Sequence, residues 1–474
     1  MSSHERFRRR SAGIVAAATV MAYMPSYAAE FGAQLGLSAN YIDNVLQVPQ
    51  DAQKVDDVAT VISPVLTFAQ ENNRATTSVK YDLQAVYFAD RSDLNETSQQ
   101  LDANSDIRVV TDFLNLALRA NMWQQLVDPA QQLNYENLFS TRNLLDGTSG
   151  SAEPLFNHVF GPVRVQARYR YGFVQYSGGQ DTLVAEDNAR DQDARFEIGS
   201  PDLAARFTWD AKYTSERSKY DISAPYSYDL AALGVELQIA SGLRLLAAGG
   251  SETDVSVNPS AGGLDSGFWR AGFRWEPDRN NLVEATLGER FFGNSYSARI
   301  EHRAKYVDLR LSYSEEPTTE ARRQITQFAD APNGAASSDV PNIPEVTRLT
   351  TDAYLNKAGD AELKLSLRRT TLDVRAFSFK REYLALGQTE DGHGGSLTLR
   401  RNLSARSILE LLAWAEKVNL LDGNDSDDLL LRLGLYHQFS RALRGRLEYV
   451  YIDEKGVNGY IANIATLGFL WTFR

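Results

Sequence analysis

The sequence contains no cysteine, few histidines and no long apolar run beyond its first residues. The absence of cysteine excludes disulfides, thiolate metal sites and an acylated N-terminal cysteine. A membrane-spanning helix needs about 20 consecutive apolar residues, and no stretch after residue 28 approaches that length. The chain is therefore either soluble or crosses a membrane as strands, the other structure that satisfies every backbone polar group in lipid.

Arrangements of residues that could catalyse a reaction or bind a metal are also scarce. The five histidines are scattered without metal-ligand spacing, and no nucleophile elbow is present. Ser297 or Ser312 near His302 remains the one arrangement from which a barrel-embedded hydrolase could be built. We predict no enzyme, no catalytic residue, no metal and no cofactor. The net charge of −12 disfavours nucleic acid as a partner.

The first 28 residues have the pattern of an export signal. Basic residues at Arg6 and Arg8–Arg10 precede an apolar stretch from Ala12 to Met24, and Ser26-Tyr-Ala28 fits a cleavage site. A membrane anchor is the alternative, but about 13 apolar residues are too few to span a bilayer. We predict a signal peptide over 1–28 and one domain over 29–474.

Apolar and polar residues alternate with a period of two along most of the remaining chain. From Val163 to Phe173 every odd residue is apolar or aromatic and the even residues are mostly arginine. This pattern is typical of a strand, since a helix would mix the two sets around its circumference. The period recurs at 307–313, 361–368, 429–435, 443–451 and 467–473.

Short and long connections also alternate between these segments. Outer-membrane barrels have short periplasmic turns and longer extracellular loops. Segmenting the chain this way gives about 22 strands, with 18 to 24 admissible because boundaries carry errors of ~2–4 residues. We predict an all-β protein, a transmembrane antiparallel up-and-down barrel in the bacterial outer membrane. Its expected partners are membrane lipid, lipopolysaccharide and the barrel assembly machinery, and a soluble β-sandwich is the alternative.

The final strand is expected to carry the signal for barrel assembly. Phe469, Trp471 and Phe473 lie on one face, although Arg474 follows the aromatic residue with which such barrels generally end. This face fixes which side of each strand meets lipid, so the arginine-bearing faces are expected to line the lumen. The side chains assigned there are Arg164, Arg168, Arg170, Arg270, Arg274, Arg310, Arg368, Arg432, Arg444 and Arg446.

Two interpretations of these arginines remain open. A net-basic lumen would favour anions, for instance an anionic exopolysaccharide. Alternatively, the arginines pair with inward carboxylates and hold the wall rigid. The sequence does not decide between them.

A barrel this wide needs something to fill or gate its opening. The best candidate is the long segment 315–360, which is expected either to fold inward as a constriction or to form an extracellular loop. Acidic clusters at 186–187, 191–193 and 422–428 are placed in loops, where they could collect calcium or remain solvated; solvated charge is preferred.

Several short motifs resemble the uncharacterised outer-membrane barrels associated with the PEP-CTERM/exosortase exopolysaccharide system. They are Ala39-Asn-Tyr-Ile-Asp-Asn44, Val58-Ala-Thr-Val-Ile-Ser-Pro-Val-Leu66, Tyr169-Arg-Tyr171, Arg401-Asn-Leu-Ser-Ala-Arg406, Gln438-Phe-Ser-Arg-Ala-Leu443, Glu448-Tyr449 and Tyr460-Ile-Ala-Asn463. Ile42 departs from the pattern, which usually has Thr there. The resemblance implies a role in exopolysaccharide export or retention, as a pore or a surface anchor. A structural or adhesive barrel that binds polymer through its loops is the alternative.

Overall fold

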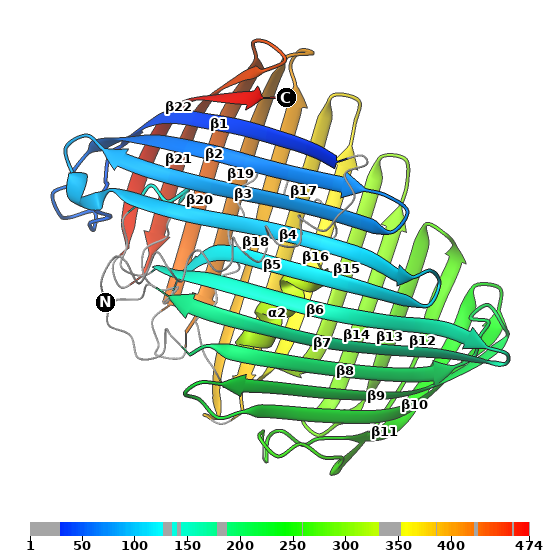
Figure 1. Cartoon of the computed structure of the whole chain (residues 1–474). Coiled ribbons are helices and arrows are strands. Elements are labelled where there is room, and N and C mark those ends of the chain that lie inside the picture. Colours follow the sequence, from blue (N-terminus) through cyan, green and yellow to red (C-terminus); the bar gives the residue numbers. More distant parts are fainter. Residues whose placement is uncertain are drawn as a thin grey trace.

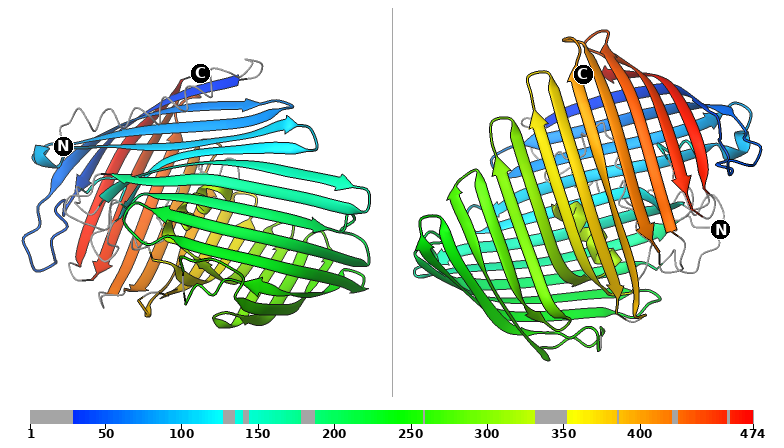
Figure 2. Two further views of the ribbon diagram at one scale, coloured as in Figure 1. Left: turned by 60° about the horizontal axis from the view of Figure 1, so that its bottom comes forward. Right: turned by 180° about the vertical axis from the view of Figure 1, so that it is seen from behind.

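The structure is a computed structural model that describes residues 29–126, 135–139, 144–177, 187–257, 259–330, 352–384, 386–420, 425–456 and 459–473. The predicted signal peptide and Arg474 lie outside these residues. Twenty-two antiparallel strands follow one another around a single closed sheet (Figures 1 and 2). The first and last strands close it, with register from Ala33↔Phe473 to Ile42↔Ile464. The predicted all-β barrel and its strand number are confirmed.

The first eleven strands form the wall that faces the reader in Figure 1. They are β1 (Ala29–Ile42), β2 (Asp57–Glu71), β3 (Ala75–Phe88), β4 (Glu96–Val110), β5 (Leu114–Leu126), β6 (Leu144–Phe160), β7 (Val163–Ser177), β8 (Ala189–Gly199), β9 (Phe207–Tyr220), β10 (Tyr226–Ala240) and β11 (Leu243–Glu252). A short 3-10 helix, η1 (Ser92–Leu94), lies between β3 and β4.

The other eleven strands form the wall behind. They are β12 (Ser266–Asp278), β13 (Asn281–Arg290), β14 (Gly293–Arg303), β15 (Val307–Thr318), β16 (Tyr354–Ser366), β17 (Thr370–Tyr383), β18 (Gln388–Asn402), β19 (Ser407–Asn419), β20 (Asp425–Gln438), β21 (Leu443–Lys455) and β22 (Tyr460–Phe473). Between β15 and β16 lies the helix α2 (Glu320–Asp330). None of the helices within the described residues is long and apolar enough to cross a membrane.

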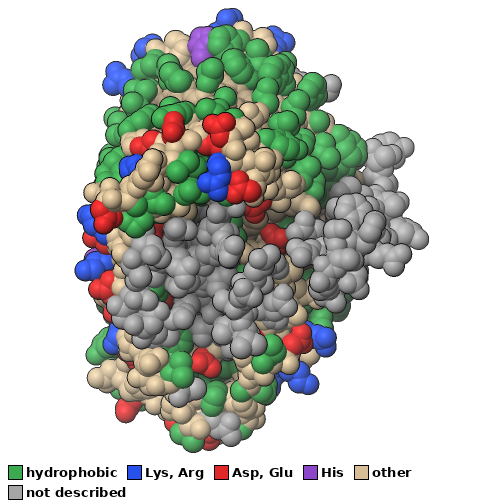
Figure 3. Space-filling view, turned by 90° about the vertical axis from the view of Figure 1, so that its left-hand side faces the viewer, with side chains coloured by type: hydrophobic (Ala, Val, Ile, Leu, Met, Phe, Trp, Pro, Cys, Tyr) green, Lys and Arg blue, Asp and Glu red, His purple; other side chains and the backbone are tan. Residues whose placement is uncertain are grey.

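The two faces of each strand differ as the alternation predicts. On β7, Tyr169 and Tyr171 are exposed outward, whereas Arg170 between them is 1% exposed. On β22, Leu467 and Phe473 are exposed and Thr466 is buried. Hydrophobic side chains gather over the upper part of the view in Figure 3, and charged side chains lie across its middle and along its margin. This outer face is suited to the acyl chains of a bilayer.

Short turns join the strands at one end of the barrel, the turn end, and longer connections join them at the other, the loop end. Gly161 and Gly242 adopt positive φ at the turn end, a conformation that glycine enters without steric cost. At Gly242 a Cβ atom would lie 2.4 Å from the carbonyl oxygen of Glu276, so only glycine fits this turn. The loop end carries 43–56, 253–265 and 319–353, among others.

The connection expected over 315–360 is shorter than predicted. Strand β15 continues to Thr318 and β16 begins at Tyr354. Helix α2 packs against β6 and β7 and touches β5 and β8, on the wall opposite the strands that carry it. The helix therefore lies inside the barrel, as Figures 1 and 2 show. Of the two alternatives, the position of α2 agrees with an inward segment; residues 331–351 lie outside the described residues.

Candidate functional site

The site of greatest chemical interest lies where α2 meets the inner face of β7, β8 and β9. On these strands Arg170, Asp193 and Glu216 are direct cross-strand partners and form one inward row. Gly172, Asp191 and Ser218 form the neighbouring row toward the loop end. Two-residue spacing puts both rows on the lumen side, because successive strand residues point to opposite faces.

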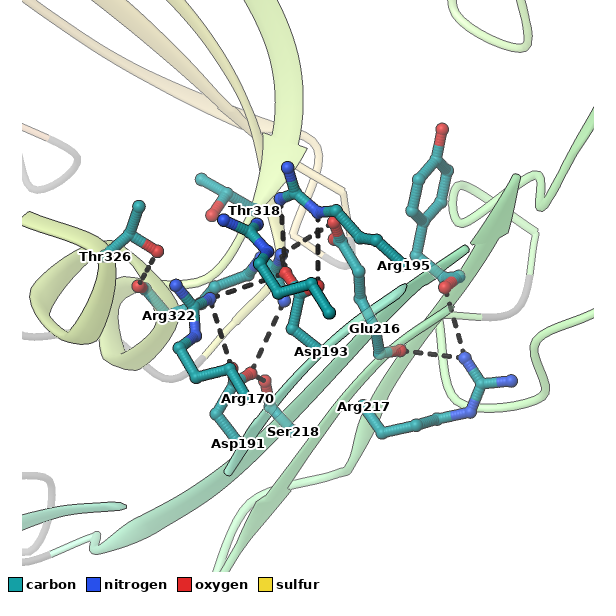
Figure 4. Close-up of polar contacts among 12 residues, drawn as sticks. Arg170, Asp191, Asp193, Arg195, Glu216, Arg217, Ser218, Thr318, Arg322 and Thr326 are labelled. Atoms are coloured by element: carbon teal, nitrogen blue, oxygen red, sulfur yellow. Dashed lines mark hydrogen bonds and ion pairs between the residues drawn. The ribbon is translucent and has the colours of Figure 1, made fainter. Parts of the chain in front are cut away.

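Arg322 of α2 reaches into this pair of rows (Figure 4). Its Nη2 lies 2.5 Å from Asp193 Oδ2 and 2.6 Å from Glu216 Oε1, and its Nη1 lies 3.6 Å from Asp191 Oδ1. Arg170 Nη2 lies 3.5 Å from Asp193 Oδ2 and 3.7 Å from Asp191 Oδ2. We call these five residues, Arg170, Asp191, Asp193, Glu216 and Arg322, the α2 ionic cluster.

All five side chains of the α2 ionic cluster are buried, Asp191 and Asp193 completely. Burial by itself lowers the pKa of Arg322, but the carboxylates of Glu216, Asp191 and Asp193 together raise it by more, so the net shift of the pKa is upward. The guanidinium therefore stays charged. Removing it would take the nearest cation from three buried carboxylates, of which Asp191 and Asp193 would keep Arg170 and Arg195 as partners. Such a loss is costly in a medium of low dielectric constant.

Helix α2 packs closely against the wall through two apolar side chains among those that the structure describes. Ala321 and Ile325, four residues apart on one helical face, are buried. A Cβ atom at Gly172 would lie 3.0 Å from Ile325 Cγ2, so the glycine allows the helix to approach β7. At the start of α2, Tyr354 donates a hydrogen bond of 3.2 Å to Glu320 Oε2. Burial raises the pKa of Glu320, but Arg323 and further partners bring it below its ordinary value.

A second inward segment, Tyr135–Phe139, lies between β5 and β6. Leu138 and Phe139 are buried in an apolar cluster with residues of β1–β3 and β19–β22, among them Tyr460. The Phe139 and Tyr460 ring centroids are 6.2 Å apart. Glu136 Oε2 lies 3.4 Å from Arg446 Nη2, and Asn137 donates to Ser98 Oγ at 2.8 Å. Apolar packing holds this segment, whereas ion pairs dominate the docking of α2.

The structure places nine of the ten predicted lumen arginines on strands, and most of them pair with carboxylates. Nearest carboxylate partners are Glu197 for Arg164, Glu153 for Arg168, Asp193 for Arg170, Glu284 for Arg274, Asp308 for Arg310, Glu410 for Arg432 and Glu448 for Arg446. The guanidinium of Arg444 lies over the Tyr436 ring, and Arg270 is exposed.

Arg368 is not a strand residue, and its predicted position is wrong. Strand β16 ends at Ser366, and Arg368 is exposed in the turn before β17. Leu367 and Thr370 exchange backbone hydrogen bonds of 2.8 and 3.4 Å across that turn. The alternation at 361–367 continues to Arg368 in the sequence, but the hairpin closes two residues earlier.

A net-basic lumen is not what the buried charges indicate. Buried cations of the described residues are Arg170, Arg322, Arg381 and Arg432. Buried carboxylates outnumber them and are Asp57, Asp187, Asp191, Asp193, Glu216, Asp229, Glu252, Glu315, Glu320, Glu390, Glu410, Glu416, Asp428, Glu448 and Glu454. Together with the ion pairs above, this balance favours the interpretation in which the arginines cross-link the wall.

Of the α2 ionic cluster, the sequence analysis predicts Arg170 in the lumen, places Asp191 and Asp193 wrongly, and does not identify Glu216 or Arg322. Asp191 and Asp193 were assigned to an acidic loop, but they begin β8 and point inward. Arg322 was not singled out, although 320–328 is an uninterrupted run of helix-compatible residues with apolar Ala321 and Ile325 at i, i+4 spacing. That run was the available signal.

The structure does not bring together the residues from which a hydrolase could be built. On β14, Ser297 and His302 lie on opposite faces: Ser297 bonds to Thr286 Oγ1 inside, and His302 contacts Asn281. Among the described residues no group of three potential ligands is arranged for a metal ion.

A closed barrel with an even number of antiparallel strands, an apolar outer face and a polar interior is the architecture of bacterial outer-membrane proteins, and this chain is one of them. Solved structures with a similar fold are receptors of that membrane. A variant of the ferric enterobactin receptor from Pseudomonas aeruginosa matches over 95% of this chain and 82% of the receptor, at 11% identity and a TM-score of 0.50.

Two further receptors match over nearly the same shares of both chains, with lower TM-scores. The siderophore receptor PirA from Pseudomonas aeruginosa matches over 95% of this chain and 81% of its own, at 10% identity and a TM-score of 0.46. The ferric-catecholate import receptor Fiu from E. coli K12 matches over 94% and 82%, at 10% identity and 0.40. This likeness concerns the fold alone. No family model and no curated protein matches the chain, so its predicted family membership stays a prediction.

Proposed function

We propose that this protein is a gated outer-membrane channel whose lumen is closed by two of its own segments, α2 and Tyr135–Phe139. The observation that carries the proposal is the docking of α2 inside the barrel through the α2 ionic cluster. A helix held across a lumen by ion pairs, with Ala321 and Ile325 as the buried apolar contacts among its described side chains, can leave without disrupting the wall. Such a segment is a bistable element of the kind on which gating depends.

The cargo that we propose is an exopolysaccharide, as the motif resemblance implies. Tyrosines near α2 support this class: Tyr220, Tyr226 and Tyr354 point inward from β9, β10 and β16, and Tyr226 and Tyr354 are buried. Tyrosine rings combine a flat apolar face with a polar hydroxyl, which suits the alternating faces of sugar rings. Because carboxylates neutralise the wall arginines, a neutral or weakly charged polymer fits this lumen better than a strongly anionic one.

A second candidate is a closed platform that retains polymer at the surface through its loops. The observation in its favour is that both inward segments are docked at once. The long connections at the loop end would then face outward and bind the polymer. A barrel that retains cell-associated polymer but never conducts would support the platform and overturn the channel.

The channel is tested by the ion selectivity of the refolded protein in planar bilayers under a KCl gradient. We expect a weak preference for cations, since buried carboxylates outnumber buried arginines and charge along a pore sets selectivity. Arg270→Gln, which removes an exposed lumen charge, should shift the reversal potential further toward cations. The matched control is Lys417→Gln, because Lys417 faces outward between the buried Glu416 and Val418. A strong anion preference would contradict the ion-paired wall.

A further inference from the structure

The groove that receives Arg322 is built by the barrel wall and not by α2. Its carboxylates come from β8 and β9, and the two on β8 contact other side chains of the wall. Ser218 Oγ donates a hydrogen bond of 2.8 Å to Asp191 Oδ1, and Arg195 Nε lies 3.2 Å from Asp193 Oδ1. We call the three carboxylates Asp191, Asp193 and Glu216 the α2 socket. Since these contacts do not involve α2, Asp191 and Asp193 are positioned by the wall without the helix.

The geometry of the α2 socket matches a planar guanidinium. One terminal nitrogen of Arg322 lies within 2.6 Å of oxygens from two different carboxylates, and the other faces the third carboxylate. A guanidinium presents its donors as a rigid fork and engages carboxylates from one edge, whereas an ammonium is a compact, strongly hydrated point charge. Because the three carboxylates are spread around both terminal nitrogens of Arg322, we expect the socket to favour the wider guanidinium over an ammonium.

A second observation is that some buried polar atoms around Arg322 have no hydrogen-bond partner within the described residues. The hydroxyl of Tyr226, a residue 2% exposed, has no hydrogen-bond partner among the described residues. This tyrosine lies close enough to Glu216 and Arg322 to interact electrostatically with both. Arg322 Nη1 likewise makes no hydrogen bond within the described part of the chain. A buried polar network with unused groups is less stable than a fully bonded one, so a better-fitting ligand could replace Arg322.

We propose that the α2 socket is a recognition site for a guanidinium group on an incoming ligand, which takes the place of Arg322 and so frees α2 from the wall. Binding at the socket is a property of β8 and β9; its consequence for the channel rests on the proposed function. The ligand class is a guanidinium-bearing molecule small enough to enter the loop end.

The first test measures binding of methylguanidinium to the full chain in detergent by titration calorimetry. In Arg322→Gln no guanidinium of the chain occupies the socket. We therefore expect methylguanidinium to bind this variant at least about tenfold more tightly than the wild type, a difference on the scale of one charge-assisted hydrogen bond. Adding Asp193→Asn should remove that gain. Methylammonium should bind more weakly than methylguanidinium. Equal binding to wild type and variant, no effect of Asp193→Asn, or equal binding of methylammonium would each overturn the proposal.

The second test needs no variant and remains valid if Arg322→Gln does not fold. Trypsin cleaves after arginine, and the buried Arg322 is protected while it occupies the socket. At equal ionic strength, methylguanidinium should accelerate cleavage at Arg322 in the wild type several-fold more than methylammonium. Identical rates with the two cations would overturn the proposal.

The outcomes separate the socket from the channel. Binding of methylguanidinium to a protein that never conducts supports the socket and refutes the proposed function. A conductance that rises in Arg322→Gln without any binding of the probe supports the gate and refutes the socket.

Discussion

Replacing Arg322 with glutamine is expected to release α2 from the lumen and to shift the closed-to-open ratio of the channel by about 100-fold or more. The substitution leaves Asp191, Asp193 and Glu216 buried without the charge that lies 2.5 to 3.6 Å from them. Removing one partner from a buried ion pair costs about 3–5 kcal/mol, and tenfold in an equilibrium corresponds to about 1.4 kcal/mol.

The measurement is the open probability of single channels in planar bilayers, with heat-modifiability on a gel to show that the barrel is folded. Arg323→Gln is the matched control: it makes the same change of charge on the next residue, whose ion pair with Glu320 of 3.0 Å lies within α2 itself. The control should stay closed like the wild type. If both variants open equally, or neither does, the ionic cluster does not hold the gate.

Truncating Phe139 to alanine is expected to loosen the second inward segment and to add a separate conductance increase. Phe139 is fully buried against Tyr460 and the inner faces of β1–β3 and β19–β22. Deleting a buried phenylalanine side chain costs about 3–5 kcal/mol. Because this segment and α2 share no ion pair within the described residues, the double variant should show the sum of both effects.

Salt should affect neither segment strongly. The ion pairs of the α2 ionic cluster are buried, and buried pairs are screened much less than exposed ones, while apolar packing is not weakened by salt. Raising KCl should therefore leave the wild type closed and the contribution of Phe139→Ala unchanged. Phe207→Ala, which truncates an exposed phenylalanine on the outer face of β9, is the control and should leave the channel closed. A wild-type-like conductance in Phe139→Ala would show that Tyr135–Phe139 does not close the lumen.

The barrel could be predicted from the sequence because its strongest signals are local. Period-two alternation in segments such as 163–173 determines which residues face lipid, and alternating connection lengths determine the strand count. The inner and outer faces of β7 and β22 agree with that pattern residue by residue. Strand ends were less certain, as Arg368 and the start of β8 at Ala189 show, since a turn leaves no periodic mark of its own.

The candidate site could not be predicted because its residues meet only through tertiary structure. Asp193 and Arg322 are 129 positions apart in the chain, and nothing in either neighbourhood points to the other. The alternation of the strand assigns Asp193 to the lumen face, but this assignment requires knowing that β8 already begins before Asp193. The helical run at 320–328 indicates an element but not that it lies across the lumen from the strands that carry it.

The central claim, that α2 docked on β7 closes the lumen, is tested most directly by a reversible cross-link between them. The chain has no cysteine, so Gly172→Cys with Ile325→Cys introduces a single possible disulfide. A Cβ at Gly172 would lie 3.0 Å from Ile325 Cγ2, which puts the two Cβ atoms near the spacing that a disulfide needs. In the Arg322→Gln background we expect the oxidised protein to be closed like the wild type and reduction to open it. Equal conductance before and after reduction, with the disulfide verified on a gel, would contradict the account.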